Sequence, residues 1–329
     1  MRSRRILGLA VVAIALTGSM VACGESGSSS STSSSSSSSA GGAGCAPVKG
    51  DELVVLQDDK HLQTVDNIIP AINAKIAQPP LVVNLDKVSA ALDTDTLISL
   101  NKQVDIDRKT PENVATAFVQ DKKLTDGVEK GTGKVVIGAA NFSESQILAN
   151  MYADVLKAGG YDTSVKTVGN RELYLPALER GELSVVPEYV GTLTEFLNKG
   201  AGQASSDLDK TVTVLTGLGD KVGLKFGTPS KAADQNAFAV NKKLADDKGL
   251  KTLSDFAAKC SGTATVLGGP PECVQRPFCQ PGLEKTYGIK FGKFLPLDAG
   301  GPRTKTGLKN GQVTIGLVFS SDGSLSTNS

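Results

Sequence analysis

Two stretches of the chain repeat one pattern of helix, glycine, strand and aromatic residue. LERGELSVVPEYVGT spans residues 178–192, and LKNGQVTIGLVFSSD spans residues 308–322. In each copy a glycine stands three residues after a leucine, and an aromatic residue stands eight residues after that glycine. Each copy predicts a helix that ends at glycine and a buried strand that carries Tyr189 or Phe319 at its carboxyl end. The alternative is two unrelated helix–strand units, because this arrangement is common.

Helical and strand patterns alternate along most of the chain, which is typical of α/β lobes with largely parallel sheets. Ser143 is expected to cap the helix that follows the first strand, with Gln146 reaching back to it. Residues 241–252 are expected to form a solvent-exposed loop. The expected strands are 134–142, 161–168, 183–189, 237–241, 263–269 and 293–298, and the expected helices are 143–158, 171–180 and 253–260. In open parallel sheets ligands bind beyond the carboxyl ends of the strands, which makes the two aromatic residues of the repeat candidates for a site.

The first 45 residues are expected to lie outside the folded body. Three arginines and an apolar run within residues 1–22 indicate a signal peptide that ends at Cys23. We expect a lipid on Cys23, with plain secretion as the alternative. Residues 23–45 are rich in Ser, Gly and Ala, and about twenty such residues form a flexible tether of roughly 25 Å. These features predict an exported protein that is lipid-anchored on the outer face of the cell membrane.

Composition excludes several classes of function. Without the three arginines of the signal peptide the chain has 32 basic and 34 acidic residues, a net charge of −2, and no basic patch that would suit nucleic acid. The single histidine, His61, excludes histidine triads and sites with several histidine ligands. No G-x-S-x-G or H-E-x-x-H motif is present, so we expect no enzyme activity, no metal and no cofactor.

Four cysteines remain after Cys23. An even number in an exported protein favours two disulfides, with three possible pairings of Cys45, Cys260, Cys273 and Cys279. We favour a small loop closed by the last two cysteines, which leaves the first two to pair with each other.

Several longer stretches resemble one family closely. They are VVIGAANFSESQILANMYADVLKAGGY, NRELYLPALERGE, PEYVGT, GGPPECVQRPFCQPGLEKTYG and LKNGQVTIGLVFSSDG. All are similar to the substrate-binding proteins of osmoprotectant ABC transporters of the ProX/OsmF type, which handle glycine betaine, carnitine, choline and related solutes. The resemblance implies an α/β fold of the two-lobed periplasmic-binding-protein type (type II), hinged, with a ligand cleft between the lobes. It also implies that the protein delivers its solute to permease subunits and their ATPase.

The order of these segments differs from that of the family. LVVLQDDKHLQTVDNIIPAI and LISLNKQVDIDRKTPENVATAFVQ also resemble the family, which normally carries them at its C-terminus. Here they precede the first strand, so the chain looks circularly permuted. The pattern in residues 51–126, one strand followed mostly by helices, cannot bury its faces alone. We therefore expect residues 46–190 to form lobe one, with 46–126 completing it, residues 191–322 to form lobe two, and residues 323–329 to form a tail.

The resemblance places candidate ligand-binding residues at the cleft. They are Asn141, Phe142, Ser143, Tyr174, Tyr189, Thr192, Gln235, Asn236, Arg276, Phe319 and Asp322. Aromatic faces would attract a quaternary ammonium, and amide, hydroxyl or guanidinium donors would bind a carboxylate. Glu188 is expected to accept backbone N–H bonds near the hinge. With five tyrosines and no tryptophan, the chain is poorer in cage tyrosines than its relatives. A site for another zwitterion or an amino acid, or a sensor on the same fold, remains the alternative.

Overall fold

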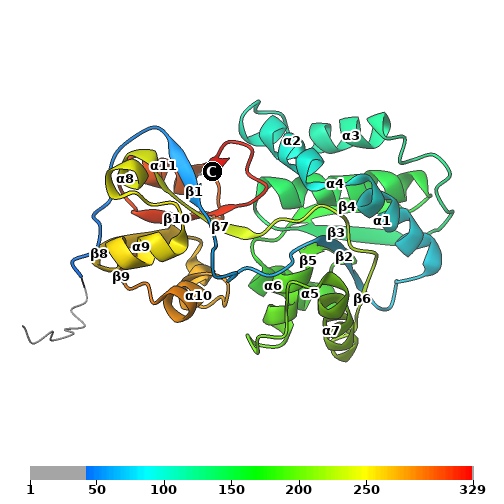
Figure 1. Cartoon of the computed structure of the whole chain (residues 1–329). Coiled ribbons are helices and arrows are strands. Elements are labelled where there is room, and N and C mark those ends of the chain that lie inside the picture. The colour runs from blue at the N-terminus through cyan, green and yellow to red at the C-terminus, as the bar shows by residue number, and fades with distance from the viewer. Residues whose placement is uncertain (1–41, 328–329) are drawn as a thin grey trace, which may run out of the picture. The chain divides into compact units, whose positions relative to one another are not determined.

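The computed structural model describes residues 42–327, which contain two β-sheets with helices packed on their faces (Figure 1). The predicted signal peptide, Cys23 and most of the Ser-rich tether lie outside the described residues. Each sheet has an apolar core on either side, and we call each sheet with its helices a lobe.

Lobe one contains a five-stranded sheet in the order β4-β3-β5-β2-β6. Four helices cover one face of this sheet and three cover the other (Figure 1). The strands are β2 (Ile68–Asn73), β3 (Lys134–Ala139), β4 (Asp162–Thr167), β5 (Val185–Tyr189) and β6 (Leu224–Phe226). The helices are α1 (Pro79–Ala91), α2 (Thr94–Asp105), α3 (Pro111–Asp121) and α4 (Ser143–Ala158) on the first face, and α5 (Arg171–Arg180), α6 (Val190–Leu197) and α7 (Leu208–Lys221) on the second.

Lobe two contains a six-stranded sheet in the order β11-β1-β7-β10-β8-β9. Its strands are β1 (Leu53–Leu56), β7 (Asn236–Asn241), β8 (Gly262–Gly269), β9 (Phe291–Pro296), β10 (Ile315–Phe319) and β11 (Ser326–Thr327). Its helices are α8 (Lys242–Lys248), α9 (Leu253–Cys260), α10 (Gln280–Gly282) and α11 (Pro302–Lys309), with short turns η1 (Pro271–Val274) and η2 (Leu283–Tyr287).

Each sheet is largely parallel, as predicted, but both are mixed because each contains one reversed strand. The β2 strand runs antiparallel to β5 and β6, and β7 runs antiparallel to β1 and β10. Each of these two strands is the first that the chain forms after crossing from the other lobe, through residues 57–67 or 227–235. A strand whose amino end lies on the side of the sheet that faces the other lobe runs opposite to strands whose carboxyl ends lie on that side.

The division between the sheets does not follow the predicted boundary at residue 190. The β1 strand lies in lobe two because it pairs with β7, although it belongs to the segment expected to complete lobe one. Conversely, β6 pairs with β2, which keeps α6 and α7 in lobe one. As expected, residues 51–126 do not form a lobe of their own, but they contribute a strand to each sheet.

Two local predictions fail for identifiable reasons. Residues 51–126 were expected to hold one strand followed mostly by helices, but IIPAIN at residues 68–73 forms a second, fully buried strand, β2, which lacks the alternation that would have revealed it. Residues 242–248 form α8 rather than a loop. Asn241 caps this helix by accepting from the backbone N–H of Lys243, and Gly249 ends it with a φ of 60°. Both residues are standard helix-end markers that the sequence already contained.

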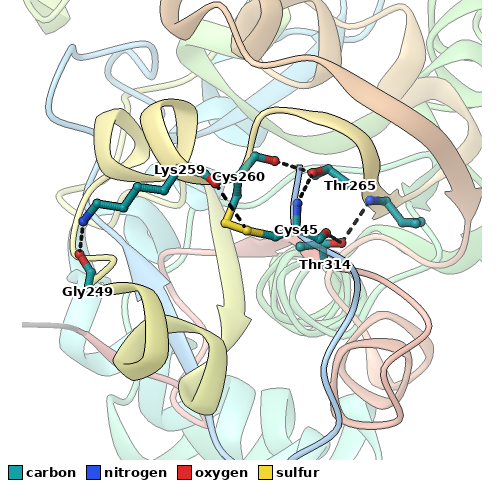
Figure 2. The surroundings of a disulfide bond; sticks show 7 residues. Cys45, Gly249, Lys259, Cys260, Thr265 and Thr314 are labelled. Carbon is teal, nitrogen blue, oxygen red and sulfur yellow. Dashed lines mark hydrogen bonds between the residues drawn. A yellow bond between two sulfur atoms is a disulfide. The ribbon is translucent and has the colours of Figure 1, made fainter. Parts of the chain in front are cut away.

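Both favoured disulfides are present. Cys45 bonds to Cys260 at the end of α9, and Cys273 bonds to Cys279. Figure 2 shows the first of these, where the backbone N–H of Cys45 donates to Thr265 at 3.0 Å and Thr314 donates to the Cys45 carbonyl at 2.9 Å. This disulfide ties the start of the described chain to lobe two. No helix within residues 42–327 combines the length and apolar character needed to span a membrane.

Candidate functional site

Three aromatic rings from both lobes meet where strands of the two sheets end. Tyr189 ends β5 and Phe319 ends β10, as the repeat predicts, and Phe142 lies between β3 and α4. The ring centroid of Phe142 lies 6.4 Å from that of Tyr189 and 5.4 Å from that of Phe319. Gly181 and Gly311, the glycines of the repeat, have φ values of 82° and 67°, which glycine adopts without strain. The two repeated units therefore bring their aromatic residues to the same place.

The rings line a cavity between the lobes with a volume of about 90 Å³. A single water molecule needs about 10–15 Å³ of such space, so the cavity has room for a small solute. Six aromatic residues contribute to its wall: Phe142, Tyr174, Tyr189, Phe196, Phe278 and Phe319.

Eight of the eleven residues predicted for the site line this cavity. They are Asn141, Phe142, Tyr174, Tyr189, Thr192, Asn236, Arg276 and Phe319. Five belong to lobe one, namely Asn141, Phe142, Tyr174, Tyr189 and Thr192, and the other three, Asn236, Arg276 and Phe319, belong to lobe two. The geometry thus brings together most of a set that spans almost 180 residues of sequence.

The other three predicted residues lie elsewhere. Ser143 and Asp322 line a neighbouring cavity, and Gln235 lines a third one. Ser143 Oγ donates to a carboxylate oxygen of Asp105 at 2.6 Å. Asp322 is held in an ion pair with Lys305, and the Gln235 side chain donates to a backbone carbonyl of the first crossing segment. Each of the three side chains is therefore engaged away from the aromatic cavity.

The predicted helix cap at Ser143 is also wrong. Ser143 is the first residue of α4 rather than its cap, and Phe142 in the cap position makes no side-chain bond. Ser145 instead accepts the backbone N–H of Ala140 at 2.9 Å. This bond joins the end of β3 to the first turn of α4 and sets the position from which Phe142 reaches the cavity.

A buried ion pair supports the lobe-one wall. Arg171 donates to Glu188 through Nε at 2.9 Å and through Nη2 at 2.7 Å, and both side chains are buried. Glu188 also accepts from the Tyr174 hydroxyl at 2.9 Å, and Arg171 donates to Thr192 Oγ1 at 2.9 Å. Glu188 accepts one backbone N–H, that of Tyr189, so the prediction of backbone partners holds only in part. This network orients four cavity residues around a single carboxylate.

A second network lies behind Tyr189. Its hydroxyl donates to Glu144 at 2.6 Å, and Glu144 also accepts from Asn101 at 2.6 Å and from Ser321 Oγ at 2.7 Å. The backbone N–H of Ser321 donates to Asp234 at 3.0 Å. Burial raises the pKa of Glu144 and of Asp234; the Asp105 charge further raises the pKa of Glu144, and the Glu144 charge further raises the pKa of Asp234. Because Ser321 follows β10 of lobe two, the network connects the two lobes next to Tyr189.

Asp66 holds the turn that follows Tyr189. Its Oδ1 accepts the backbone N–H groups of Gly191 and Thr192, both at 2.9 Å, and burial raises its pKa to about 7. A side chain at position 191 would place its Cβ 2.3 Å from the carbonyl oxygen of Val65, so only glycine fits there. The crossing segment thereby fixes the start of α6, and with it the Thr192 hydroxyl at the cavity.

The small disulfide loop forms the lobe-two wall. Cys273 and Cys279 line the cavity together with Arg276 and Phe278, which lie between them. Arg276 reaches lobe one, where it donates to Glu172 through Nε at 3.2 Å and Nη2 at 2.9 Å. Burial and the Arg276 guanidinium act in opposite directions on the pKa of Glu172, and the net effect lowers it. The carboxylate is therefore charged and bridges the two lobes beside the cavity.

Sequence reasoning missed several lining residues, among them Asp66, Arg171, Phe196, Asp234 and Phe278. Phe278 could have been found, because it lies in the same short disulfide loop as Arg276. Arg171 begins a charged helix, and nothing near it in sequence indicates its partner 17 residues later, so it was not singled out. The two aspartates lie in the crossing segments, which had no pattern of their own.

Most of the chain matches one known protein family. Residues 46–121 and 133–329 match the family described as the substrate-binding domain of ABC-type glycine betaine transport systems. A glycine-betaine-binding protein of Pseudomonas aeruginosa is 30% identical over 200 residues, which cover 57% of this chain and 62% of that protein. The glycine betaine-binding protein YehZ of Escherichia coli is 27% identical over 199 residues, 57% of this chain and 65% of that protein.

The alignments cover less than two thirds of the length of these relatives, at 62% and 65%. Among solved structures, a crystal structure described as a glycine betaine/carnitine/choline ABC transporter aligns with 59% of this chain and 74% of its own. Its sequence identity is 23% and its TM-score is 0.38.

Proposed function

Because the chain belongs to the family of substrate-binding domains of ABC-type glycine betaine transport systems, we propose that it captures a quaternary-ammonium osmoprotectant outside the cytoplasm. The solute would be of the glycine betaine, choline or carnitine class. The loaded protein would then deliver it to the permease subunits and ATPase of an ABC importer.

The meeting of Phe142, Tyr189 and Phe319 is the observation that carries this proposal. A quaternary ammonium has no N–H donor, so hydrogen bonds cannot select it. Aromatic faces attract it through their quadrupoles, with roughly 0.5–2 kcal/mol for each good contact. The rings come from both lobes and face a space of about 90 Å³, which has room for a small solute.

Capture would proceed by closure of the lobes. Residues 57–67 and 227–235 are the two segments through which the chain crosses between the sheets, and they are the natural hinge. A ligand that contacts Tyr189 in lobe one and Phe319 in lobe two stabilises the closed form relative to the open one. The permease would recognise that closed form.

Calorimetric titration of the purified full chain with glycine betaine, choline and carnitine tests the proposal. We expect saturable heat with at least one of the three. A flat response to all three would remove the quaternary-ammonium assignment and leave another zwitterion, an amino acid or a sensory role to be considered.

Tyr189→Ala should weaken binding by about tenfold or more, because it removes one ring from the cavity wall; tenfold corresponds to about 1.4 kcal/mol. Tyr189→Phe keeps the ring and loses only the hydrogen bond to Glu144, so its affinity should stay close to that of the unaltered protein. Thermal unfolding of both variants shows that they are folded. Equal affinities for Tyr189→Ala and the unaltered protein would place Tyr189 outside the site.

We also infer that the chain is a circular permutant of its family. The β11 strand pairs with β1, so Ser326 lies opposite Val54, and the end of the described chain lies beside the segment that follows it in the usual order (Figure 1). A variant that starts at Gly127 and carries residues 42–126 behind Thr327 through a Gly/Ser linker restores that order. It should fold with both disulfides and bind the same solutes. An unfolded product would argue against the permutation.

Export and lipid attachment at Cys23 complete the proposal. The expected Ser-rich tether of about twenty residues would let the folded body reach a permease in the same membrane. Mass spectrometry of the membrane fraction should find a lipid on the N-terminal cysteine, and Cys23→Ser should release the protein into the medium. Membrane attachment that survives this substitution would exclude the lipid.

A further inference from the structure

The positive charges that line the aromatic cavity are already paired. Within residues 42–327, the basic side chains on its wall are Arg171 and Arg276. Glu188 binds the first guanidinium through two oxygens, at 2.9 and 2.7 Å. Glu172 binds the second through two oxygens, at 3.2 and 2.9 Å. A ligand carboxylate that approaches either guanidinium therefore meets a glutamate carboxylate already bound to it.

Displacing either glutamate would be costly. The Arg171–Glu188 pair is buried, and an unpaired buried charge is strongly destabilising. Arg276 lies between two acids, since Glu272 stands 3.6 Å from the same Nη2 that binds Glu172. A carboxylate arriving at Arg276 would therefore meet two negative charges around one positive charge.

The remaining acids of the wall do not help a ligand carboxylate. Asp66 and Glu195 accept backbone N–H groups, and Asp234 accepts the backbone N–H of Ser321 and the hydroxyl of Ser320. Whether these acids carry a proton or a negative charge, they supply no positive charge to the ligand. A cation, in contrast, benefits from both the carboxyl groups and the aromatic faces.

Asn170 gives an independent indication that the ligand carries a hydroxyl group. It lines the cavity, and among the described residues its Oδ1 is buried without a hydrogen-bond partner. An acceptor that lacks a donor is satisfied by a ligand hydroxyl. A carboxylate brings only further acceptors and would leave the oxygen unsatisfied.

Accepting the proposed function, we propose that the cavity prefers a quaternary-ammonium alcohol, a monocation with a neutral hydroxyl tail, over a zwitterionic betaine. The paired arginines exclude the carboxylate, the aromatic rings hold the ammonium group, and the Asn170 amide oxygen accepts from the hydroxyl.

Calorimetric titration of the full chain with matched ligands tests this preference. The probes are choline, glycine betaine and 3,3-dimethyl-1-butanol, which replaces the nitrogen of choline by carbon and has no charge. We expect choline to bind at least about tenfold more tightly than glycine betaine, a difference of about 1.4 kcal/mol. The neutral alcohol should give no measurable binding.

Glu172→Gln tests the reason for the preference. The substitution removes one carboxylate from Arg276, so the affinity for glycine betaine should rise severalfold while that for choline stays constant or falls. Glu182→Gln is the matched control, because it breaks the exposed two-oxygen pair of Glu182 with Arg180 outside the cavity. The control should leave the ratio of the two affinities unchanged.

The outcomes separate this inference from the proposed function. Choline binding that is tighter than betaine binding, with a ratio that narrows in Glu172→Gln, supports the inference. Betaine binding that is equal or tighter overturns it and leaves the quaternary-ammonium function standing. Failure of both ligands to bind overturns the inference, and a flat response to carnitine as well would also remove the proposed function.

Discussion

Replacing Cys45 and Cys260 together by alanine is expected to lower the free energy of unfolding by about 5 kcal/mol. The two cysteines are separated by 215 residues, so their bond removes much of the freedom of the unfolded chain. The bond also lies in a buried setting, where the Cys45 backbone N–H donates to Thr265 and the Cys45 carbonyl accepts from Thr314 (Figure 2), which holds residues 42–50 against lobe two. Alanine avoids burying a new hydroxyl group at either position.

The second disulfide provides the matched control. Cys273 and Cys279 are only 6 residues apart, and loss of a loop of that size costs about 2 kcal/mol on the same entropic reasoning. Urea unfolding of the two double variants measures both values. Equal losses would show that strain or packing, rather than closure of the long loop, accounts for the stabilisation. The Cys273/Cys279 variant should also weaken ligand binding, because its loop carries Arg276 and Phe278 to the cavity.

Glu188→Gln is expected to destabilise the protein by about 3–5 kcal/mol, since it leaves the buried Arg171 guanidinium without its counter-charge. Glutamine keeps the shape of the side chain, so the loss reports the charge rather than a cavity. Burial by itself would lower the pKa of Arg171, but the nearby Glu188 carboxylate raises it well above its usual range. Arginine is not deprotonated in proteins even without such a partner, so Arg171 stays charged and uncompensated in the variant.

Glu182→Gln is again the suitable comparison. Its partner Arg180 belongs to the same helix as Arg171, but the side chains of Arg180 and Glu182 are 59% and 61% exposed. Water and ions screen such a pair, and its loss should cost less than about 1 kcal/mol. Urea unfolding of both variants at one pH checks the contrast. Similar losses would mean that the Arg171–Glu188 pair contributes no more than a surface contact.

Local patterns predicted much of the fold. The apolar runs and glycine stops that indicated residues 143–158, 171–180 and 253–260 correspond to α4, α5 and α9 as observed. The β2 strand was missed because burial on both faces removes the alternation by which a strand is identified. The α8 helix was missed although its capping residues were present, because its charged residues favoured a loop. Its Lys242–Asp246 and Lys243–Asp247 pairs instead stabilise a short exposed helix.

For the candidate site, too, local patterns predicted some residues and missed others. Tyr189 and Phe319 were found because each stands at the end of a recognisable strand. Arg171 was not found, since its burial depends on Glu188, which only the packing of α5 on β5 brings near. Ser143 was assigned to the cavity because it follows Asn141 and Phe142 in the sequence. As the first residue of α4, however, it bonds to Asp105 instead.

Short-range periodicity and motifs were enough to predict the family, the alternation of helices and strands, and the aromatic residues that end two repeated units. Which polar and charged groups meet depends instead on how distant segments pack. The partners of Arg276, Asp66 and Ser321 lie 104, 125 and 177 residues away. Such pairs form when two sheets are brought together by their crossing segments. Their electrostatic energy depends on burial and distance in space, which no local pattern of residues encodes.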